Sequence, residues 1–345
     1  MEYRVLGSTG VRVSVLCLGA MMFGDWGNKD HDESIKIIHR AIENGINFID
    51  TADVYSQGES EIIVGKALKG VERSNIVLAT KVHAQMGTEQ NQRGNSRRWI
   101  ISEVEASLKR LNVDHIDLYQ IHRPDEDTDI DETLSALSDL VHSGKIRYFG
   151  SSTFPAQKIV EAQWRSKERN FERFVTEQPP YSMLVRGIEK NILPTTIKYN
   201  MGVLPWSPLA GGWLSGKFGI GKENQSMRAK RIPERYDLSI PENQTKVEIV
   251  SKLQDLADEA GISLIEMALA FVLEHPAITA AIIGPRTVEH LESQLGAASI
   301  TLEESLLDKI DEIVPPGTNI NKVDSGWAPK SLTDKSSRRR RHKPF

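Results

Sequence analysis

Short apolar runs alternate with amphipathic stretches along most of the 345-residue chain. After a short N-terminal segment, eight such runs are each followed by sequence of helical periodicity; they begin at Val15, Asn47, Ile76, Ile116, Lys145, Phe174, Gly202 and Ala280. Several runs are apolar without strict alternation, which is typical of parallel strands buried on both faces. Eight such units without an internal linker predict a closed (β/α)8 TIM barrel, because a doubly wound sheet usually has fewer strands.

The predicted barrel is flanked by a hairpin at one end and a tail at the other. Runs at residues 3–6 and 11–13 enclose Gly7-Ser8-Thr9-Gly10, which predicts an N-terminal β-hairpin that closes the bottom of the barrel. Residues 211–241 are rich in Gly, Pro and charge, and we expect a long functional loop there. We therefore expect a single domain over residues 1–315 and an extended tail over residues 316–345, basic at its end.

Charge and composition exclude several classes of function. Lys and Arg total 43 and Asp and Glu total 47, so the net charge of −4 excludes a general nucleic-acid binder. Cys17 is the only cysteine and stands in an apolar run, which excludes internal disulfides and favours a reducing compartment. The longest nearly apolar stretch, at residues 15–24, is too short to span a bilayer. We expect a cytoplasmic protein without membrane insertion, and the sequence leaves its oligomeric state open.

Four ionisable groups follow three neighbouring strands of the predicted barrel. Asp50 ends the second strand and Tyr55 lies five residues further on, while Lys81 and His122 end the third and fourth strands. Because TIM-barrel chemistry takes place at the C-terminal strand ends, we expect these side chains to meet. Lys81 is expected to lower the pKa of the Tyr55 phenol, Asp50 to hold Lys81 charged, and His122 to orient a substrate. Such a phenol can protonate a carbonyl oxygen while the carbonyl carbon receives hydride.

Long stretches around these residues resemble the aldo-keto reductase family. The resemblance covers residues 45–61, Ala79-Thr80-Lys81-Val82, residues 117–122 and 144–152, residues 205–212, and Ile283-Gly284-Pro285-Arg286-Thr287. The pattern is most similar to bacterial aldo/keto reductases related to potassium-channel β-subunits. The resemblance implies an NADP-dependent oxidoreductase that reduces aldehydes or ketones, with Asp50, Tyr55, Lys81 and His122 as the catalytic tetrad and Tyr55 as proton donor.

The resemblance also implies a cofactor site that prefers NADPH over NADH. A helix N-terminus with an arginine suits a 2′-phosphate, and close backbone approach suits a pyrophosphate. The implied cofactor-binding residues are Gly19, Ala20, Met21, Asp50, Ser152, Thr153, Gln178, Trp206, Ser207, Pro208, Leu209, Ala210, Gly211, Lys217, Arg228, Gly284, Arg286, Thr287, His290 and Gln294. Thr153 departs from the Asn that is common in the family, and His290 and Gln294 depart from Gln and Asn.

The substrate and two other classes of function are less constrained by the sequence. Tyr55, His122 and Trp26 are candidate substrate contacts, with core packing as the alternative for Trp26. No metal is expected, because the histidines lack metal-ligand spacing, and no G-x-G-x-x-G follows a strand. The alternatives are an NADPH-binding regulatory or channel-associated subunit with little turnover, and an unrelated barrel such as a lyase or hydrolase.

Overall fold

A closed barrel of eight parallel strands forms the centre of the protein. The computed structural model describes residues 1–218, 229 and 232–339. Its strands run in the order β10, β3, β4, β5, β6, β7, β8, β9, with bounds β3 (Leu16–Gly19), β4 (Phe48–Asp50), β5 (Val77–Val82), β6 (Ile116–Ile121), β7 (Ile146–Ser152), β8 (Thr176–Gln178), β9 (Gly202–Val203) and β10 (Ala281–Ile283). The Thr279 N–H donates to the Val203 carbonyl and the Ile282 N–H to the Pro205 carbonyl, both at 2.9 Å, which joins the last two strands. The predicted (β/α)8 barrel is confirmed.

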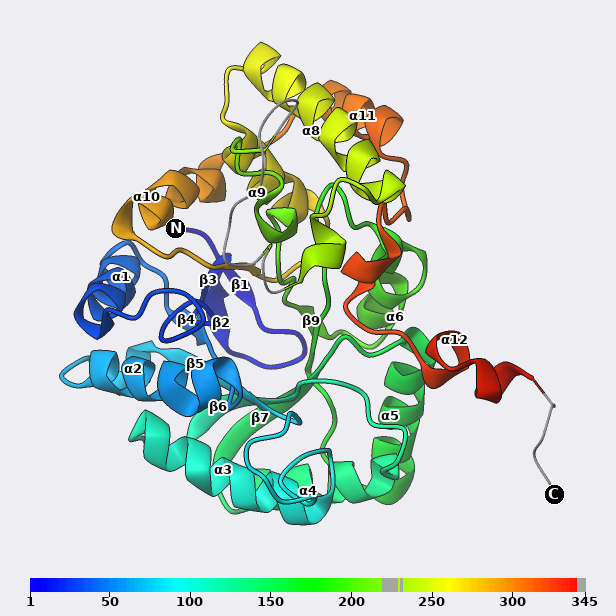
Figure 1. The fold of residues 1–345 in the computed structure, drawn as a ribbon. Helices are drawn as coiled ribbons and strands as arrows, with labels where there is room; N and C mark the ends of the chain where they lie inside the picture. The colour runs from blue at the N-terminus through cyan, green and yellow to red at the C-terminus, as the bar shows by residue number, and fades with distance from the viewer. Residues whose placement is uncertain (219–228, 230–231, 340–345) are drawn as a thin grey trace.

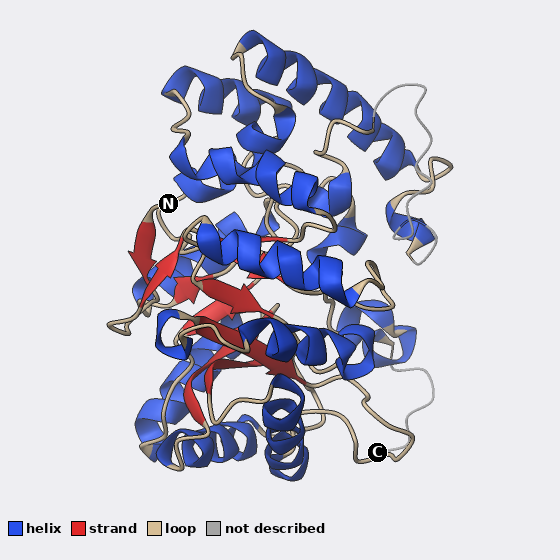
Figure 2. Cartoon of the chain, turned by 90° about the vertical axis from the view of Figure 1, so that its left-hand side faces the viewer, coloured by secondary structure: helices blue, strands red, loops and turns tan. Residues whose placement is uncertain are grey.

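Helices surround the strands on the outside, as Figures 1 and 2 show. Their bounds are α1 (His31–Glu43), α2 (Glu59–Leu68), α3 (Arg97–Leu111), α4 (Ile130–His142), α5 (Ala156–Arg169), α6 (Ile192–Lys198), α8 (Pro241–Glu259), α9 (Leu264–Glu274), α10 (Val288–Leu295), α11 (Glu304–Ile313) and α12 (Lys330–Thr333). Polar N-caps fix several starts: the Ser96 side chain accepts from the Trp99 N–H, and Ser263 forms a capping box with Glu266. The apolar faces of these helices pack on the strands and form the main core.

The N-terminal hairpin closes the bottom of the barrel, as predicted. Strands β1 (Tyr3–Val5) and β2 (Arg12–Ser14) pair antiparallel. Leu6 and Val13 are fully buried and join the cluster of apolar side chains inside the barrel. Gly7 has a φ of +56°, and a Cβ there would approach the Val175 carbonyl oxygen to 2.5 Å. A glycine is therefore required where the hairpin turn meets the ends of the strands.

The segment after residue 315 crosses the opposite, C-terminal mouth before it leaves the barrel. The Ile320 N–H donates to the Leu184 carbonyl, and the Arg186 N–H donates to the Thr318 carbonyl. Beyond this segment, the chain runs through α12 and away from the barrel (Figure 1). Residues 340–345, which hold part of the basic end, lie outside the described residues. Among the helices of the described residues, none is long and apolar enough to cross a membrane.

Candidate active site

A buried ion pair lies where strands β4 and β5 end. The Lys81 ammonium donates to Asp50 Oδ2 and to the Thr51 carbonyl, each at 2.6 Å. Both side chains of the pair are buried within the barrel. Asp50 Oδ1 accepts from the Gln178 and Gln120 amides at 2.9 and 3.1 Å. The carboxylate is thus satisfied on both oxygens, which fixes the position of the Lys81 ammonium.

The Tyr55 phenol lies directly above this ion pair. Lys81 Nζ donates to Tyr55 Oη at 3.3 Å and lies 4.9 Å from the centre of the Tyr55 ring. Tyr55 begins a short 3-10 helix, Tyr55–Gly58, in which Ser56 and Gln57 have φ values of +49° and +55°. Such left-handed backbone is costly for residues other than glycine. The loop therefore holds the phenol in one place through an unusual backbone path.

Burial and neighbouring charges set the protonation states of this group. Burial raises the pKa of Tyr55 above its ordinary value, although Lys81 opposes this shift. Burial is also the largest influence on the pKa of Lys81, which it lowers, but Asp50 and Tyr55 together raise that pKa above its usual value. The expected lowering of the Tyr55 pKa is therefore outweighed by burial. At neutral pH the site therefore holds a neutral phenol against a charged ammonium.

His122 completes the group from the end of β6. Its ring lies 5.7 Å from the Tyr55 ring at 80°, centre to centre. Burial, with contributions from Arg123, Lys81 and His83, lowers the pKa of His122 well below its ordinary value. A neutral imidazole carries one N–H, so His122 can donate a hydrogen bond to a neutral oxygen without adding charge. The structure thus brings Asp50, Tyr55, Lys81 and His122 together.

Two polar residues of this site were absent from the sequence-based set. Gln120 is fully buried and donates to Asp50, and Arg123 directly follows His122. Gln120 had a detectable signal, since it is a polar residue within the apolar strand Ile116–Ile121. Arg123 had no such signal in the sequence, because an arginine after a strand is most often a surface residue.

Beside the ion pair, a turn after β7 presents polar groups toward β8. The Ser152 hydroxyl donates to the Gln178 carbonyl at 2.9 Å, and the Thr153 N–H donates to the same carbonyl at 3.2 Å. Thr153 has a φ of +58°, a backbone conformation in which Asn is more frequent than Thr. The Gln178 amide reaches Asp50, so these three predicted residues form one connected cluster with the ion pair.

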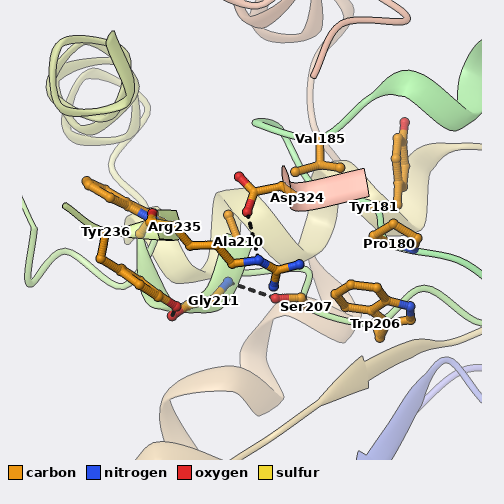
Figure 3. Close-up of a pocket in the computed structure, with 11 residues that line it drawn as sticks. Pro180, Tyr181, Val185, Trp206, Ser207, Ala210, Gly211, Arg235, Tyr236 and Asp324 are labelled. Carbon is orange, nitrogen blue, oxygen red and sulfur yellow. Dashed lines mark hydrogen bonds and ion pairs between the residues drawn. The ribbon is translucent and has the colours of Figure 1, made fainter. Parts of the chain in front are cut away.

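A small cavity that is partly open to solvent lies at the end of β9 (Figure 3). Trp206, Ser207, Ala210 and Gly211 of the predicted cofactor set line it, whereas Pro208 and Leu209 do not. The Gly211 N–H donates to the Ser207 hydroxyl at 2.7 Å across a turn in which both residues have positive φ. The Ala210 and Gly212 N–H groups likewise donate within the turn, to the Ser207 and Leu209 carbonyls, so its own hydrogen bonds close this turn.

The C-terminal segment and the long loop cover the same cavity. The Asp324 carboxylate lies 3.4 Å from Arg235 Nε (Figure 3). It also pairs with the buried Lys246, at 2.5 Å. A Cβ at Gly326, which has a φ of +79°, would approach the Trp206 ring to 2.6 Å. Arg235, Asp324 and Gly326 thus belong to the site, although they come from parts of the chain in which we predicted only a loop and a tail.

The remaining predicted cofactor residues lie around the ends of β3 and β10. The Lys217 ammonium lies 3.4 Å from His290 Nε2, which joins the long loop to the first turn of α10. Thr287 caps this helix, and Gln294 Nε2 donates to the His290 carbonyl. The Asn28 amide donates to the Arg286 carbonyl at 3.0 Å, and a Cβ at Gly284 would meet only open space. Of the rest, Gly19 ends β3, Ala20 and Met21 directly follow it, and Arg228 lies outside the described residues.

Trp26 faces the site from the loop after β3. The centre of its ring lies 6.0 Å from the centre of the Tyr55 ring, and its backbone N–H donates to the Ser56 hydroxyl at 3.0 Å. Trp26 is partly exposed, so it does not belong to the apolar core. Its place beside Tyr55 is compatible with a substrate contact.

Among the described residues, no cluster of His, Cys, Asp or Glu is arranged to hold a metal ion.

A buried carboxyl group supports the turn at residues 152–154 from behind. Glu177 accepts from the Ser151 hydroxyl and from the Phe154 N–H, and burial raises its pKa to about 7. A carboxyl whose folded pKa is raised stabilises the fold at low pH, and this contribution is lost as pH rises toward 7. The free energy of unfolding of the wild type should fall by about 3 kcal/mol as pH rises from about 4.5 to 7. We expect Glu177→Gln to remove this fall.

Denaturant unfolding of the wild type and of Glu177→Gln at several pH values measures how the stability of each protein depends on pH. The wild type is expected to lose stability relative to the variant between about pH 4.5 and 7, because only the wild type must bury a carboxylate. Parallel stability profiles for the two proteins would contradict the assignment of this slope to Glu177.

Comparisons with known proteins agree with this geometry. The model of the Aldo/keto reductase family matches residues 15–315. An uncharacterized oxidoreductase, YrpG, of Bacillus subtilis (strain 168) is 42% identical over 92% of this chain and 97% of its own length. A probable voltage-gated potassium channel subunit beta of Arabidopsis thaliana is 33% identical over 91% of this chain and 97% of its own length. A versiconal hemiacetal acetate reductase of Aspergillus parasiticus is 32% identical over 92% of this chain and 98% of its own length. The match over the whole barrel establishes that the chain belongs to the aldo/keto reductase family.

Proposed function

We propose that the protein reduces aldehydes or ketones to alcohols with NADPH, and that Tyr55 donates the proton. The observation that carries this proposal is the position of the Lys81 ammonium, which contacts Asp50 on one side and the Tyr55 hydroxyl on the other. A neutral phenol beside a fixed cation at the C-terminal end of the strands supports general-acid catalysis. The oxidoreductases among the relatives, YrpG and the versiconal hemiacetal acetate reductase, support the reaction class.

The residues around the site fit a nicotinamide nucleotide. The polar cluster of Ser152 and Gln178 lies beside the ion pair, where a carboxamide would find hydrogen-bonding partners. The turn at residues 207–211 lines the cavity at the end of β9, and we expect the pyrophosphate to lie beside this turn. Lys217 and His290 meet at the N-terminus of α10, which favours a further phosphate. These residues would hold the cofactor along the C-terminal mouth, from β7 to α10.

The chain's own side chains then divide the chemistry among them. When bound, the reduced nicotinamide supplies hydride to the carbonyl carbon. His122 donates a hydrogen bond that orients the carbonyl oxygen, and Tyr55 transfers its proton to that oxygen as negative charge develops. Lys81 stabilises the phenolate that remains, and Asp50 keeps Lys81 charged and fixed. General-acid assistance of this kind is worth about 10²- to 10⁴-fold in rate.

Loss of NADPH absorbance with a panel of aldehydes and ketones tests the proposal. We expect NADPH consumption to match alcohol formation over many turnovers. Tight NADPH binding with very slow nucleotide release and little turnover would instead support a regulatory subunit of the kind named among the relatives. Absence of any NADPH binding would place the protein outside nicotinamide chemistry.

Arg286 is expected to favour NADPH over NADH. It stands between β10 and α10, beside the contact of Lys217 with His290. An arginine there can pair with a 2′-phosphate, which NADH lacks. We expect Arg286→Ala to weaken NADPH about tenfold or more and to leave NADH within about twofold. Fluorescence titration with both nucleotides measures the dissociation constants, and equal losses would exclude a 2′-phosphate contact at Arg286.

A further inference from the structure

Arg123 is a cation beside the reacting groups with no acidic partner. Its Nη1 atom donates to the His122 carbonyl at 2.5 Å, to Thr153 Oγ1 at 3.3 Å and to Ser152 Oγ at 3.4 Å. These three acceptors are uncharged. Within the described parts of the chain, no carboxylate lies within ion-pair distance of Arg123. The protein therefore holds this guanidinium in place without a carboxylate in direct contact.

Two cations near Arg123 differ from it in this respect. Lys81 is paired with Asp50, and Arg235 shares Asp324 with Lys246. Glu177, on the strand beneath Arg123, is engaged by the Ser151 hydroxyl and the Phe154 N–H. Glu177 acts on Arg123 only through space, because the two side chains make no ion-pair contact. A guanidinium that is half-buried without an anion is unfavourable, and a ligand that brings an anion relieves this cost.

The orientation of the guanidinium indicates which kind of anion it would bind. All hydrogen bonds that Arg123 makes to described residues come from Nη1, which leaves the edge formed by Nε and Nη2 without a protein acceptor. This edge presents two parallel N–H groups, the geometry that matches a carboxylate. Arg123 Cζ also lies 6.0 Å from the centre of the Trp206 ring, at the wall of the cavity.

We propose that Arg123 selects carbonyl substrates that carry a carboxylate, such as oxo acids and carboxylated aldehydes. This inference rests on the proposed carbonyl reduction and names its substrate class. The reacting carbonyl and the reduced nicotinamide ring are both uncharged, so neither neutralises Arg123. A carboxylate on the substrate pairs with the Nε/Nη2 edge while the carbonyl meets Tyr55 and His122. A neutral aldehyde leaves the guanidinium unpaired and gains nothing from it.

Matched pairs of substrates test this inference. We would measure kcat/KM for a series of short ω-oxo acids and carboxybenzaldehydes, each beside its own methyl ester, which removes the charge and keeps the carbonyl. For the best acid, the wild type is expected to prefer the acid over its ester by about tenfold or more. Arg123→Met should lower kcat/KM for that acid by about 10- to 100-fold and leave its ester within about threefold. Arg123→Lys keeps the charge but lacks the two parallel N–H groups, and it should restore part of the preference for the acid over its ester.

Arg235→Met is the matched control. The Arg235 guanidinium lies at the same 6.0 Å from the Trp206 ring, but it already has Asp324 as partner. Its replacement is expected to leave the ratio of acid to ester unchanged. NADPH titration of each Arg123 variant verifies that the protein is folded, and an unchanged dissociation constant is expected.

Each contrary outcome has a separate meaning. Equal kcat/KM for acids and esters in the wild type, or an unchanged ratio in Arg123→Met, would overturn the role of Arg123. Weakened NADPH binding in Arg123→Met would assign this residue to the nucleotide and would also overturn it. If neither acids nor esters are turned over, the proposed function fails before the role of Arg123 is reached.

Discussion

Replacement of Tyr55 by Phe is expected to lower kcat for carbonyl reduction by about 10³-fold while NADPH binding persists. The change removes only the hydroxyl, because Phe keeps the ring that packs against Trp26 and His122. Lys81 retains its hydrogen bonds to Asp50 and to the Thr51 carbonyl, so the ion pair remains in place. Without the phenol, no neutral acid is left beside the carbonyl oxygen. Single-turnover mixing of enzyme, NADPH and aldehyde measures the loss in the chemical step.

The control for this variant is its affinity for the nucleotide. Because Tyr55 is proposed to act on the substrate oxygen, the dissociation constant for NADPH should change by less than about threefold. A Tyr55→Phe protein that turns over at the wild-type rate would refute the role of proton donor. His122→Phe, which removes the orienting N–H and keeps an aromatic ring, is the matched comparison at the neighbouring position.

Replacement of Lys81 by Met is expected to destabilise the protein by about 3–5 kcal/mol and also to abolish most activity. Lys81 is fully buried, and its partner Asp50 is nearly so. Without the ammonium, the Asp50 carboxylate keeps only the Gln120 and Gln178 amides as donors and is left as an uncompensated charge. Equilibrium unfolding in denaturant, with coincident probes to verify a two-state transition, measures the loss.

A double variant separates the charge from the packing. Asp50→Asn combined with Lys81→Met removes both charges, and we expect it to recover more than half of the stability that Lys81→Met loses. Its activity should stay low, because the cation beside Tyr55 is still missing. If Lys81→Met costs less than about 1 kcal/mol, the ion pair is not the buried, mutually dependent element that this account requires.

The barrel and its four central groups were predictable from the sequence for a physical reason. Parallel strands buried on both faces give apolar runs, and the polar residues that end them stand out against this background. Asp50 ends β4, and Tyr55 follows it within one short loop. Lys81 is the second-last residue of β5, and His122 directly follows β6. Closure of the barrel then brings these ends to the same mouth, and no detailed knowledge of side-chain packing is required.

The rest of the site depends on contacts between distant loops, which periodicity does not reveal. The position of Tyr55 needs left-handed backbone at Ser56 and Gln57, residues that give no local sign of it. Asp324 meets Arg235 and Lys246 only because the segment after residue 315 returns across the mouth. The raised pKa of Tyr55 depends on its burial in the assembled site, a quantity that the spacing of residues does not contain.

Isotope labelling follows the hydrogen from the nucleotide to the product. Reduction of an aldehyde with NADPH deuterated at the transferred position of C4 should yield an alcohol with one deuterium on the former carbonyl carbon. The hydroxyl proton should come from solvent through Tyr55, and one alcohol should form for each NADPH oxidised. Alcohol without the label, or NADPH oxidised without alcohol, would contradict the account.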